Sequence, residues 1–456
     1  MELIMQINSA INSVVWGPVM IALLMGTGIY FTVRTGFLQF RKFGYILKNT
    51  IATIFSDKKS AADGSVTPFQ ALTTALAGTI GTGNIVGVAT AITTGGPGAV
   101  FWMWISALVG MMTKYSEIVL AVHYREKNSK GEWKGGPMYY IEKGLKQKWL
   151  AVVFAALASL AAFGIGNMTQ GNSIASSMKG TFGIPPIVTG LVVAALIAFT
   201  VVGGVKRIGA ITEKMVPFMS LFYIICSLLV LTINWQNIIP SFALVFRSAF
   251  TPTAAIGGFL GAGVMKAIQS GMARGIFSNE AGLGSAPIAH AAADTKHPVQ
   301  QGMWGVFEVF ADTIMVCTCT ALVILTSGLW DSGLKGSDLT MAAFSQSLSG
   351  LGGIVITIAL FFFAFSTMLG WSYYGEKSFE YLFGEKYILL YRVAFIVVAV
   401  VGSVAQLDVV WGIADTLNGL MAIPNLIGLL GLSGVVIKLT KEYFKNAGKP
   451  HAKIER

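Results

Sequence analysis

Two long apolar segments of this 456-residue chain are interrupted by residues that a membrane-spanning helix normally avoids. Residues 77–87 contain four glycines and two threonines, and residues 271–285 contain Arg274 and Glu280 among several glycines. Glycine weakens a helix, and a full charge is costly in hydrocarbon. Irregular backbone at membrane depth is tolerated where it lines a cavity or is buried in protein. Together the two segments indicate a binding site, although close packing through small residues is the alternative for residues 77–87 taken alone.

Each interruption would place helix ends inside the protein. The N-terminal end of a half-helix offers free N–H groups and a positive dipole, which suit a carboxylate. Exposed carbonyls and hydroxyls offer oxygens that suit a small cation. The site is therefore expected to bind an amino-acid-like zwitterion together with a coupling ion. A dinucleotide-binding loop is excluded, because no βαβ unit surrounds Gly81 and Gly83.

Five further side chains within apolar segments could belong to such a site. Gln170 could bond a substrate carboxylate or amine, or form an interhelical hydrogen bond worth only about 0.6 kcal/mol. Trp371 and Phe277 could wall a small pocket, and core packing is the alternative for both. Glu308 and Asp312 lie one turn apart and could form a proton relay, but paired structural charges or gates are the favoured interpretation.

The composition agrees with a membrane protein. Hydrophobic residues make up 54% of the chain and charged residues 12%, about half of the roughly 25% that soluble domains carry. Both a soluble enzyme and a disordered chain are thereby disfavoured. The net charge of +11 is interpreted as a record of topology rather than of nucleic-acid binding. The three cysteines and four histidines show no disulfide or metal-binding spacing.

Eleven apolar stretches are long enough to cross a bilayer, which needs about 20 residues per helix. A β-barrel is excluded because its strands alternate in hydrophobicity, whereas these stretches are continuous. The sequence thus predicts an all-α polytopic membrane protein with eleven transmembrane helices. The expected spans are 9–33, 69–93, 98–124, 149–178, 185–203, 212–233, 254–292, 301–327, 351–374, 388–405 and 411–438.

Basic residues concentrate on one side of this arrangement. They crowd the 34–68 and 125–148 loops and the C-terminal end, whereas the opposite loops hold only Lys179, Arg247 and Lys335. Cytoplasmic loops collect Lys and Arg. The pattern predicts an N-terminus outside, a C-terminus in the cytoplasm, and a multi-pass location in the cell membrane.

The positions of the interrupted segments suggest an internal repeat. With the first span set aside, the others form two sets of five that enter the membrane with opposite polarity, and each set opens with its interrupted span. This pattern is typical of inverted-repeat transporters, whose site lies at the bilayer midplane. The chain, 1–456, is expected to be a single transmembrane domain. Its parts would be 1–68 (extra helix and loop), 69–233 (first repeat), 254–438 (second repeat) and 439–456 (cytoplasmic tail).

Residues 274–293, which contain the run Ser278-Asn279-Glu280-Ala281-Gly282-Leu283-Gly284, resemble the alanine or glycine:cation symporter family. Three other stretches look like the same family, so that the resemblance covers essentially the whole chain. They are residues 77–98, 135–140 and 365–371. The resemblance implies a LeuT-like, inverted five-plus-five repeat core with one extra N-terminal helix and two broken helices. It also implies uptake of alanine or glycine with a cation, usually sodium.

The resemblance also implies the site residues. Backbone groups of the two breaks, the second near residues 275–279, would hold the substrate. The substrate set is Thr79, Ile80, Gly81, Thr82, Gly83, Gln170, Gly275, Ile276, Phe277, Ser278, Asn279 and Trp371. Sodium would bind the carbonyls of Ala77 and Ile80 with Ser366 and Thr367. A second sodium would lie at Thr79 and Asn84, and no other cofactor is expected.

We therefore expect a secondary active symporter that imports alanine and/or glycine with sodium by alternating access. The expected partners are the small amino acid, sodium and membrane lipid, with no nucleic acid and with a monomer as the expected form. A proton-coupled small amino-acid transporter is the alternative. An intramembrane enzyme would need an acidic or Ser/His constellation, and a passive channel would need a wide or ringed pore.

Overall fold

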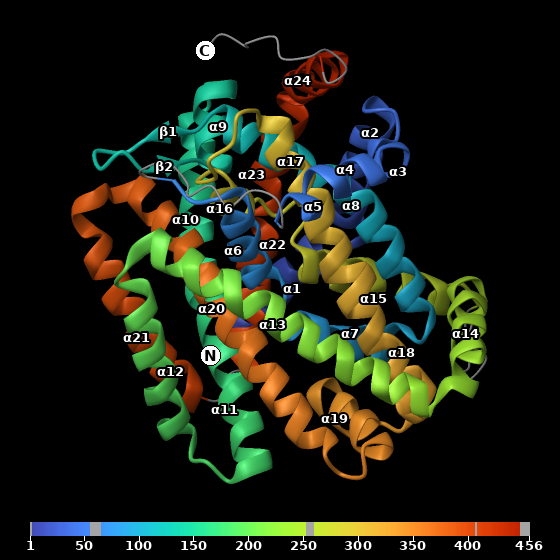
Figure 1. Cartoon of the computed structure of the whole chain (residues 1–456). Coiled ribbons are helices and arrows are strands. Elements are labelled where there is room, and N and C mark those ends of the chain that lie inside the picture. Colours follow the sequence, from blue (N-terminus) through green and yellow to red (C-terminus); the bar gives the residue numbers. More distant parts are fainter. Residues whose placement is uncertain (1, 55–64, 252–259, 406–407, 447–456) are drawn as a thin grey trace.

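The computed structural model describes residues 2–54, 65–251, 260–405 and 408–446, and these are almost entirely helical (Figure 1). A single sheet occurs in this part of the chain, a hairpin of β1 (Glu126–Lys127) and β2 (Trp133–Lys134) with Glu126 opposite Lys134. The expectation of an all-α protein is therefore confirmed. The expected basic residues Lys58, Lys59, Lys449, Lys453 and Arg456 lie outside the described residues.

Eight helical segments of the described chain are long and apolar enough to cross a membrane, and a ninth is a bent pair. Three of the eight are single helices: α8 (Gly98–His123), α13 (Gly204–Ile233) and α20 (Gly352–Phe383). Three others each join two elements: α1 (Glu2–Val15) with α2 (Pro18–Arg34), η6 (Glu385–Tyr387) with α21 (Ile388–Val404), and α22 (Asp408–Leu420) with α23 (Ala422–Gly431). The last two each contain wide turns: α10 (Lys148–Phe163) with η2 (Gly164–Met168) and α11 (Thr169–Phe182), and α17 (Pro298–Val309) with η4 (Phe310–Cys317) and α18 (Thr318–Ser327). The bent pair joins α6 (Pro68–Thr79) to η1 (Gly83–Gly87) and α7 (Val88–Gly95).

The two remaining expected spans also correspond to helices. The fifth is α12 (Pro186–Val201), which is apolar but shorter than the others, and the seventh contains α15 (Leu260–Asn279). The count of eleven membrane crossings therefore stays a prediction. The shorter elements are α3 (Leu38–Arg41), α4 (Phe43–Asn49), α5 (Ile51–Ile54), α9 (Pro137–Leu145), η3 (Trp235–Asn237), α14 (Ile238–Phe250), α16 (Pro287–His290), η5 (Leu329–Asp331), α19 (Gly336–Ser347) and α24 (Ser433–Asn446).

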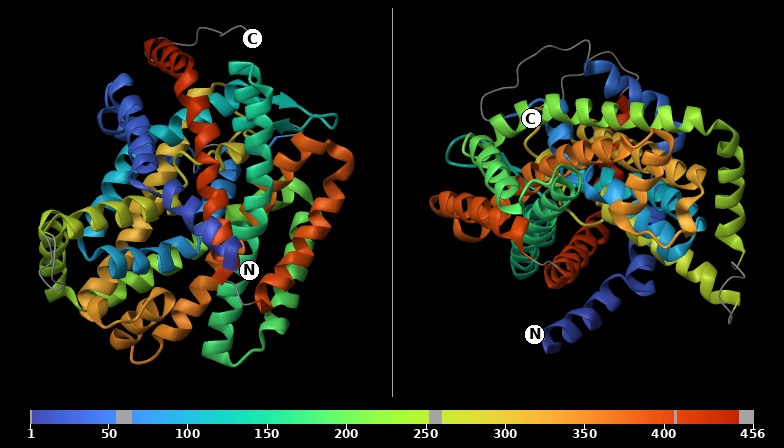
Figure 2. Two further views of the ribbon diagram at one scale, coloured as in Figure 1. Left: turned by 180° about the vertical axis from the view of Figure 1, so that it is seen from behind. Right: turned by 90° about the horizontal axis from the view of Figure 1, so that it is seen from below.

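The first and last expected spans are each divided. The first restarts at Pro18, which stands at the first position of α2, where its missing N–H leaves no helical bond unmade. The last is interrupted at Met421, between α22 and α23, and at Leu432, after which it continues as α24. Seen from behind and from below, α1 lies at the outside of the bundle, and it packs on α22 (Figure 2).

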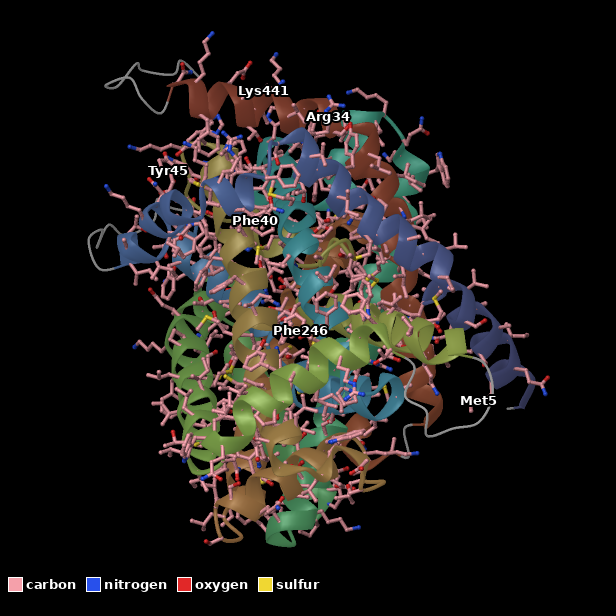
Figure 3. All side chains as sticks on the ribbon, turned by 90° about the vertical axis from the view of Figure 1, so that its right-hand side faces the viewer. Met5, Arg34, Phe40, Tyr45, Phe246 and Lys441 are labelled. Atoms are coloured by element: carbon pink, nitrogen blue, oxygen red, sulfur yellow. The ribbon has the colours of Figure 1, made fainter. Side chains whose placement is uncertain are left out.

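Helix α8 runs through the middle of the bundle and positions much of the site. It packs against α2, α14, α15 and α17, and most of its second half is buried. The hairpin β1–β2, α9 and α24 lie at one end of the molecule, and α19 lies at the other (Figure 1). Arg34 and Lys441 share the end that carries α24 (Figure 3). Basic residues from distant parts of the sequence thus meet at one end, as the expected topology requires.

Candidate functional site

The second expected span is broken where the sequence predicted it. Helix α6 ends at Thr79, residues 80–82 leave the helix, and the chain resumes as the wide turns of η1 and then α7, bent by 50°. The backbone N–H of Gly81, which the break leaves without a helical acceptor, donates to Oδ1 of Asn84 at 2.8 Å. The glycine-rich stretch is therefore a genuine helix break held by a local hydrogen bond.

The seventh expected span is also broken, but its break near residues 275–279 was wrongly placed. Helix α15 continues to Asn279, and the irregular segment covers residues 280–286 before α16 begins. The backbone angle φ is +55° at Glu280, +98° at Gly282 and +82° at Gly284. Such left-handed positions end a helix, and glycine adopts them without strain. Gly275 lies within α15 and does not interrupt it.

The segments that flank the two breaks lie against each other. A Cβ atom placed on Gly83 would lie 3.4 Å from Ser278 Cα and 3.5 Å from Phe277 Cδ1. Glycine at this position therefore lets η1 approach the last turn of α15. Gly275 and Ile276 lie earlier in that helix, and a Cβ on Gly275 would meet Met103 and Ser106 of α8 instead.

Three of the four residues expected to bind sodium meet beside the first break. Ser366 Oγ on α20 donates to the Ile80 carbonyl at 3.4 Å and to the Phe363 carbonyl at 2.8 Å. Thr367 Oγ1 bonds the Phe363 carbonyl at 2.9 Å, and a Cβ on Gly81 would overlap it. Ala77 is buried one turn earlier on α6. Hydroxyl and carbonyl oxygens thus gather where α6 ends against α20.

Asp312 on η4 connects the two breaks, a role that the sequence did not predict. Its Oδ1 accepts a hydrogen bond from Asn84 Nδ2 at 2.7 Å, and its Oδ2 accepts from Ser278 Oγ at 2.9 Å and from Thr313 Oγ1 at 2.7 Å. The carboxyl group is fully buried. Its intramembrane position was visible in the sequence, but two of its three partners come from distant segments.

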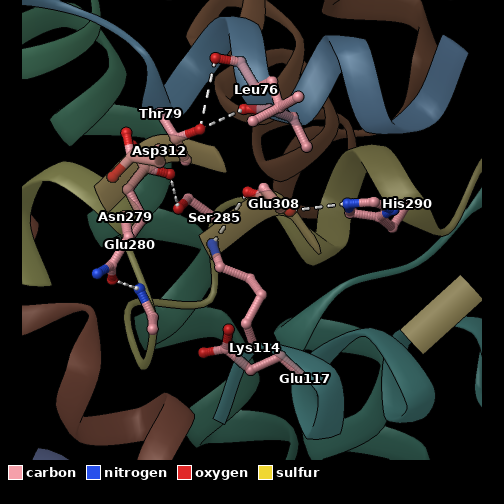
Figure 4. A network of polar contacts seen from close by, with 12 residues as sticks. Leu76, Thr79, Lys114, Glu117, Asn279, Glu280, Ser285, His290, Glu308 and Asp312 are labelled. Carbon is pink, nitrogen blue, oxygen red and sulfur yellow. Dashed lines mark hydrogen bonds and ion pairs between the residues drawn. The ribbon is translucent and has the colours of Figure 1, made fainter. Parts of the chain in front are cut away.

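Thr79 does not share in that cluster. Its hydroxyl donates back to the carbonyls of Ala75 at 3.3 Å and Leu76 at 3.4 Å within its own helix (Figure 4). Thr82 is buried just before η1, and the side-chain amide of Asn279 donates to Thr313 Oγ1 at 3.1 Å. The structure therefore places Asn84, but not the Thr79 hydroxyl, beside Asp312.

Gln170 and Trp371 lie on neighbouring faces of the fourth and ninth spans. Gln170 Nε2 donates to the Ile165 carbonyl at 2.9 Å, while its buried Oε1 has no hydrogen-bond partner among the residues that the structure describes. A Cβ on Gly166 would overlap the Trp371 side chain, so Trp371 packs directly on the backbone one turn before Gln170. Trp371 Nε1 donates to Glu280 Oε1 at 3.0 Å.

A buried ionic cluster lies between α8 and α17. Lys114 Nζ lies 3.3 Å from Glu308 Oε1, and the other oxygen of Glu308 lies 3.0 Å from His290 Nε2 (Figure 4). Glu117 Oε1 instead accepts the Gly282 N–H at 3.0 Å and the side-chain amide of Asn425 at 2.5 Å. Glu308 is thus paired with Lys114, which agrees with the interpretation of Glu308 as a paired structural charge. Glu117 instead bonds the backbone of the second break.

A cavity of about 710 Å³ lies between α7, α11, α15 and α19. Its lining is rich in Ser and Thr hydroxyls, with Lys266, Lys335 and Asp338 at its sides. Val86, two residues beyond Asn84, and Ser173, one turn beyond Gln170, also line it. The cavity therefore leads from the α19 end of the molecule toward the first break.

The long apolar helices, the paired breaks and the polar residues between them define a polytopic membrane transporter of the LeuT-like, five-plus-five class. The fold is similar to that of MhsT in complex with L-phenylalanine, with a TM-score of 0.55 and 13% identity over 85% of this chain and 100% of that one. It is also similar to the manganese transporter of Eremococcus coleocola, with a TM-score of 0.51 and 13% identity over 84% and 88% of the two chains.

The chain belongs to the sodium:alanine symporter family, whose model matches residues 1–455. It is 52% identical over 451 residues to the sodium/alanine symporter AgcS of Methanococcus maripaludis, covering 97% of this chain and 98% of that protein. It is 40% identical to the putative sodium/proton-dependent alanine carrier protein YrbD of Bacillus subtilis, covering 95% and 91%. The expected family is confirmed, and its members are secondary transporters, not enzymes.

Proposed function

We propose that this protein imports alanine, and glycine as a second substrate, together with sodium by alternating access. The observation that carries the proposal is the contact between the two breaks, where Gly83 lies against Phe277 and Ser278. Membership of the sodium:alanine symporter family supports both the substrate and the ion. Backbone groups that the breaks release from their helices are suited to bind a zwitterion of this size.

Gln170 and Trp371 fit this substrate. The buried Oε1 of Gln170 lacks a donor, and an unpaired buried acceptor costs about 1–3 kcal/mol. A substrate ammonium group would supply the missing donor. Trp371 and Phe277 would leave room only for a small side chain. We propose that the substrate contacts come from Thr79, Ile80, Gly81, Thr82, Gly83, Gln170, Phe277, Ser278, Asn279 and Trp371.

The sodium site would use the carbonyls of Ala77 and Ile80 and the hydroxyls of Ser366 and Thr367. These ligands are neutral oxygens, which favour a metal cation over a proton because none of them can take up a proton near neutral pH. For a second sodium, the geometry supports Asn84 with Asp312, since the Thr79 hydroxyl turns back into its own helix.

Proton coupling is the second candidate, because the buried carboxyl group of Asp312 lies beside the two breaks. Asp312 contacts both of them through Asn84 and Ser278. Glu308, by contrast, lies between Lys114 and His290, which supports a structural role for it. Asp312 is therefore the group that would carry a transported proton.

The proposal also includes how the protein sits in the membrane. The end that carries Arg34 and Lys441 would face the cytoplasm, which places the C-terminus inside and the N-terminus outside (Figure 3). The many exposed Leu, Ile, Val and Phe side chains would contact lipid. The protein would work as a monomer in the cell membrane, with 69–233 and 254–438 as its two repeats.

Uptake of radiolabelled alanine into proteoliposomes tests the proposal. An inward sodium gradient should drive accumulation, and unlabelled glycine should compete with the label. The double variant Ser366→Ala, Thr367→Ala should need a higher sodium concentration for half-maximal uptake. Uptake that follows a pH gradient and ignores sodium would overturn the sodium assignment in favour of Asp312.

A further inference from the structure

The indole of Trp371 is fixed at its polar edge by an acidic residue of the second break. Trp371 is 1% exposed and Glu280 3% exposed, and the indole N–H donates to Glu280 Oε1 at 3.0 Å. A hydrogen bond from a neutral donor to a carboxylate is stronger than one between neutral groups. Both partners are buried, so water cannot replace the bond without entering the site.

Glu280 is itself held in a strained backbone position. It is the first residue of the irregular segment, and its φ of +55° is uncommon for any residue other than glycine. Its second carboxylate oxygen accepts a hydrogen bond from Ser285 at the far end of that segment (Figure 4). Strain of this kind persists where the surroundings fix the residue, and it clusters at functional sites. One oxygen of the Glu280 carboxylate therefore bonds Ser285 at the far end of the break, and the other bonds the indole N–H of Trp371.

Trp371 lies one helical turn from Gln170, a proposed substrate contact. Its side chain packs on the backbone of Gly166, one turn before Gln170, and its ring meets Tyr374 edge-on with centroids 5.6 Å apart. The indole therefore bridges the fourth span, the ninth span and the second break. Without an acceptor for its N–H, it could turn about its side-chain torsions and change the space beside Gln170.

We propose that Glu280 is a positioning residue that holds Trp371 in place and thereby limits the size of the substrate side chain. This inference rests on the proposed function, because it needs the substrate to bind between the two breaks. Glu280 acts through Trp371, and the oxygen that accepts the indole N–H is the feature that matters. A substitution of Glu280 that keeps an acceptor oxygen should therefore keep the limit on the size of the substrate side chain.

The test compares alanine and leucine as substrates of four variants in proteoliposomes under one sodium gradient. The measured quantity is the KM for leucine divided by the KM for alanine. Glu280→Ala removes the acceptor and Trp371→Phe removes the donor, so each should lower this ratio about tenfold. The double variant should match the single ones, since both changes break one bond. Glu280→Gln keeps an acceptor and should restore most of the wild-type ratio.

Trp304→Phe is the matched control, because this buried indole on α17 packs against Phe69 and belongs to a different hydrophobic cluster from Trp371. It should leave the ratio unchanged. A wild-type ratio in Glu280→Ala, additive effects in the double variant, or a Glu280→Gln ratio as low as that of Glu280→Ala would each overturn the inference. Should Glu280→Ala fail to fold, Trp371→Phe and Glu280→Gln still decide it. Absence of sodium-driven alanine uptake by the wild type would instead overturn the proposed function.

Discussion

The breaks in the second and seventh spans end their helices by different means. The first is made by residues 80–82, and the oxygens around it come from the Ile80 carbonyl and the hydroxyls of α20. The second is made by left-handed residues from Glu280 onward and is held by carboxylates, with Glu117 accepting the Gly282 N–H. The first break is therefore suited to bind a cation. The second is held in place by the carboxylates of Glu117 and Glu280, and Glu280 also bonds the neighbouring Trp371.

The largest expected effect comes from Gly81→Ala at the first break. The new methyl group would overlap Thr367 Oγ1, a proposed sodium ligand, and it would also favour helix by about 1 kcal/mol. Sodium-dependent alanine binding should fall below detection in a protein that still folds, measured by binding of labelled alanine and by melting temperature. Gly87→Ala is the matched control, since nothing lies within 4 Å of its Cβ position. Normal alanine affinity in Gly81→Ala would show that the first break does not form the site.

A smaller effect is expected from Asp312→Asn, which changes the contact between the breaks. The new amide keeps one acceptor oxygen and replaces the other by an NH2 donor, so either Asn84 or Ser278 loses its acceptor, and a buried donor left unpaired costs about 1–3 kcal/mol. The sodium concentration for half-maximal uptake should rise about tenfold. Asp331→Asn, at an exposed position of η5 outside the lining of the cavity, should change it little. A normal sodium requirement combined with a lost pH response would favour the proton alternative.

Gly275→Ala should affect stability rather than binding. Its Cβ would lie 3.2 Å from Met103 Cγ and would press on Ser106, both in α8 and not in the other break. Overpacking of this kind costs about 1–3 kcal/mol, which should lower the melting temperature by roughly 2 °C. Alanine affinity should stay normal, as in Gly26→Ala, whose Cβ position is open. Loss of alanine affinity without a change in melting temperature would show that Gly275 belongs to the substrate site after all.

The smallest effect is expected from Thr79→Val. The hydroxyl bonds only carbonyls of its own helix, and such bonds contribute little to helix stability. The sodium concentration for half-maximal uptake should change by less than about threefold. A tenfold rise would make Thr79 a sodium ligand and would contradict the assignment of that role to Asp312.

The sequence predicted the class of fold and the first break because both depend on local patterns. Apolar runs of about 20 residues identify helices that cross a membrane, and a cluster of glycines identifies a helix break. Such patterns did not locate the second break, since Gly275 and Gly282 look alike in sequence and only the folded backbone separates them, helical at Gly275 and left-handed, with φ of +98°, at Gly282. The role of Asp312 was likewise not predictable, because Asn84 and Ser278 approach it only in the folded protein.

The central claim is that the two breaks form one site that binds alanine and sodium together. It is tested most directly by the dissociation constant of alanine for the purified protein, measured by calorimetry at a series of sodium concentrations. Two ligands that share a site bind with reciprocal coupling. The account predicts that the alanine dissociation constant falls as sodium rises in the wild type, and that Ser366→Ala, Thr367→Ala flattens this dependence. An alanine dissociation constant that is the same at all sodium concentrations in the wild type would contradict it.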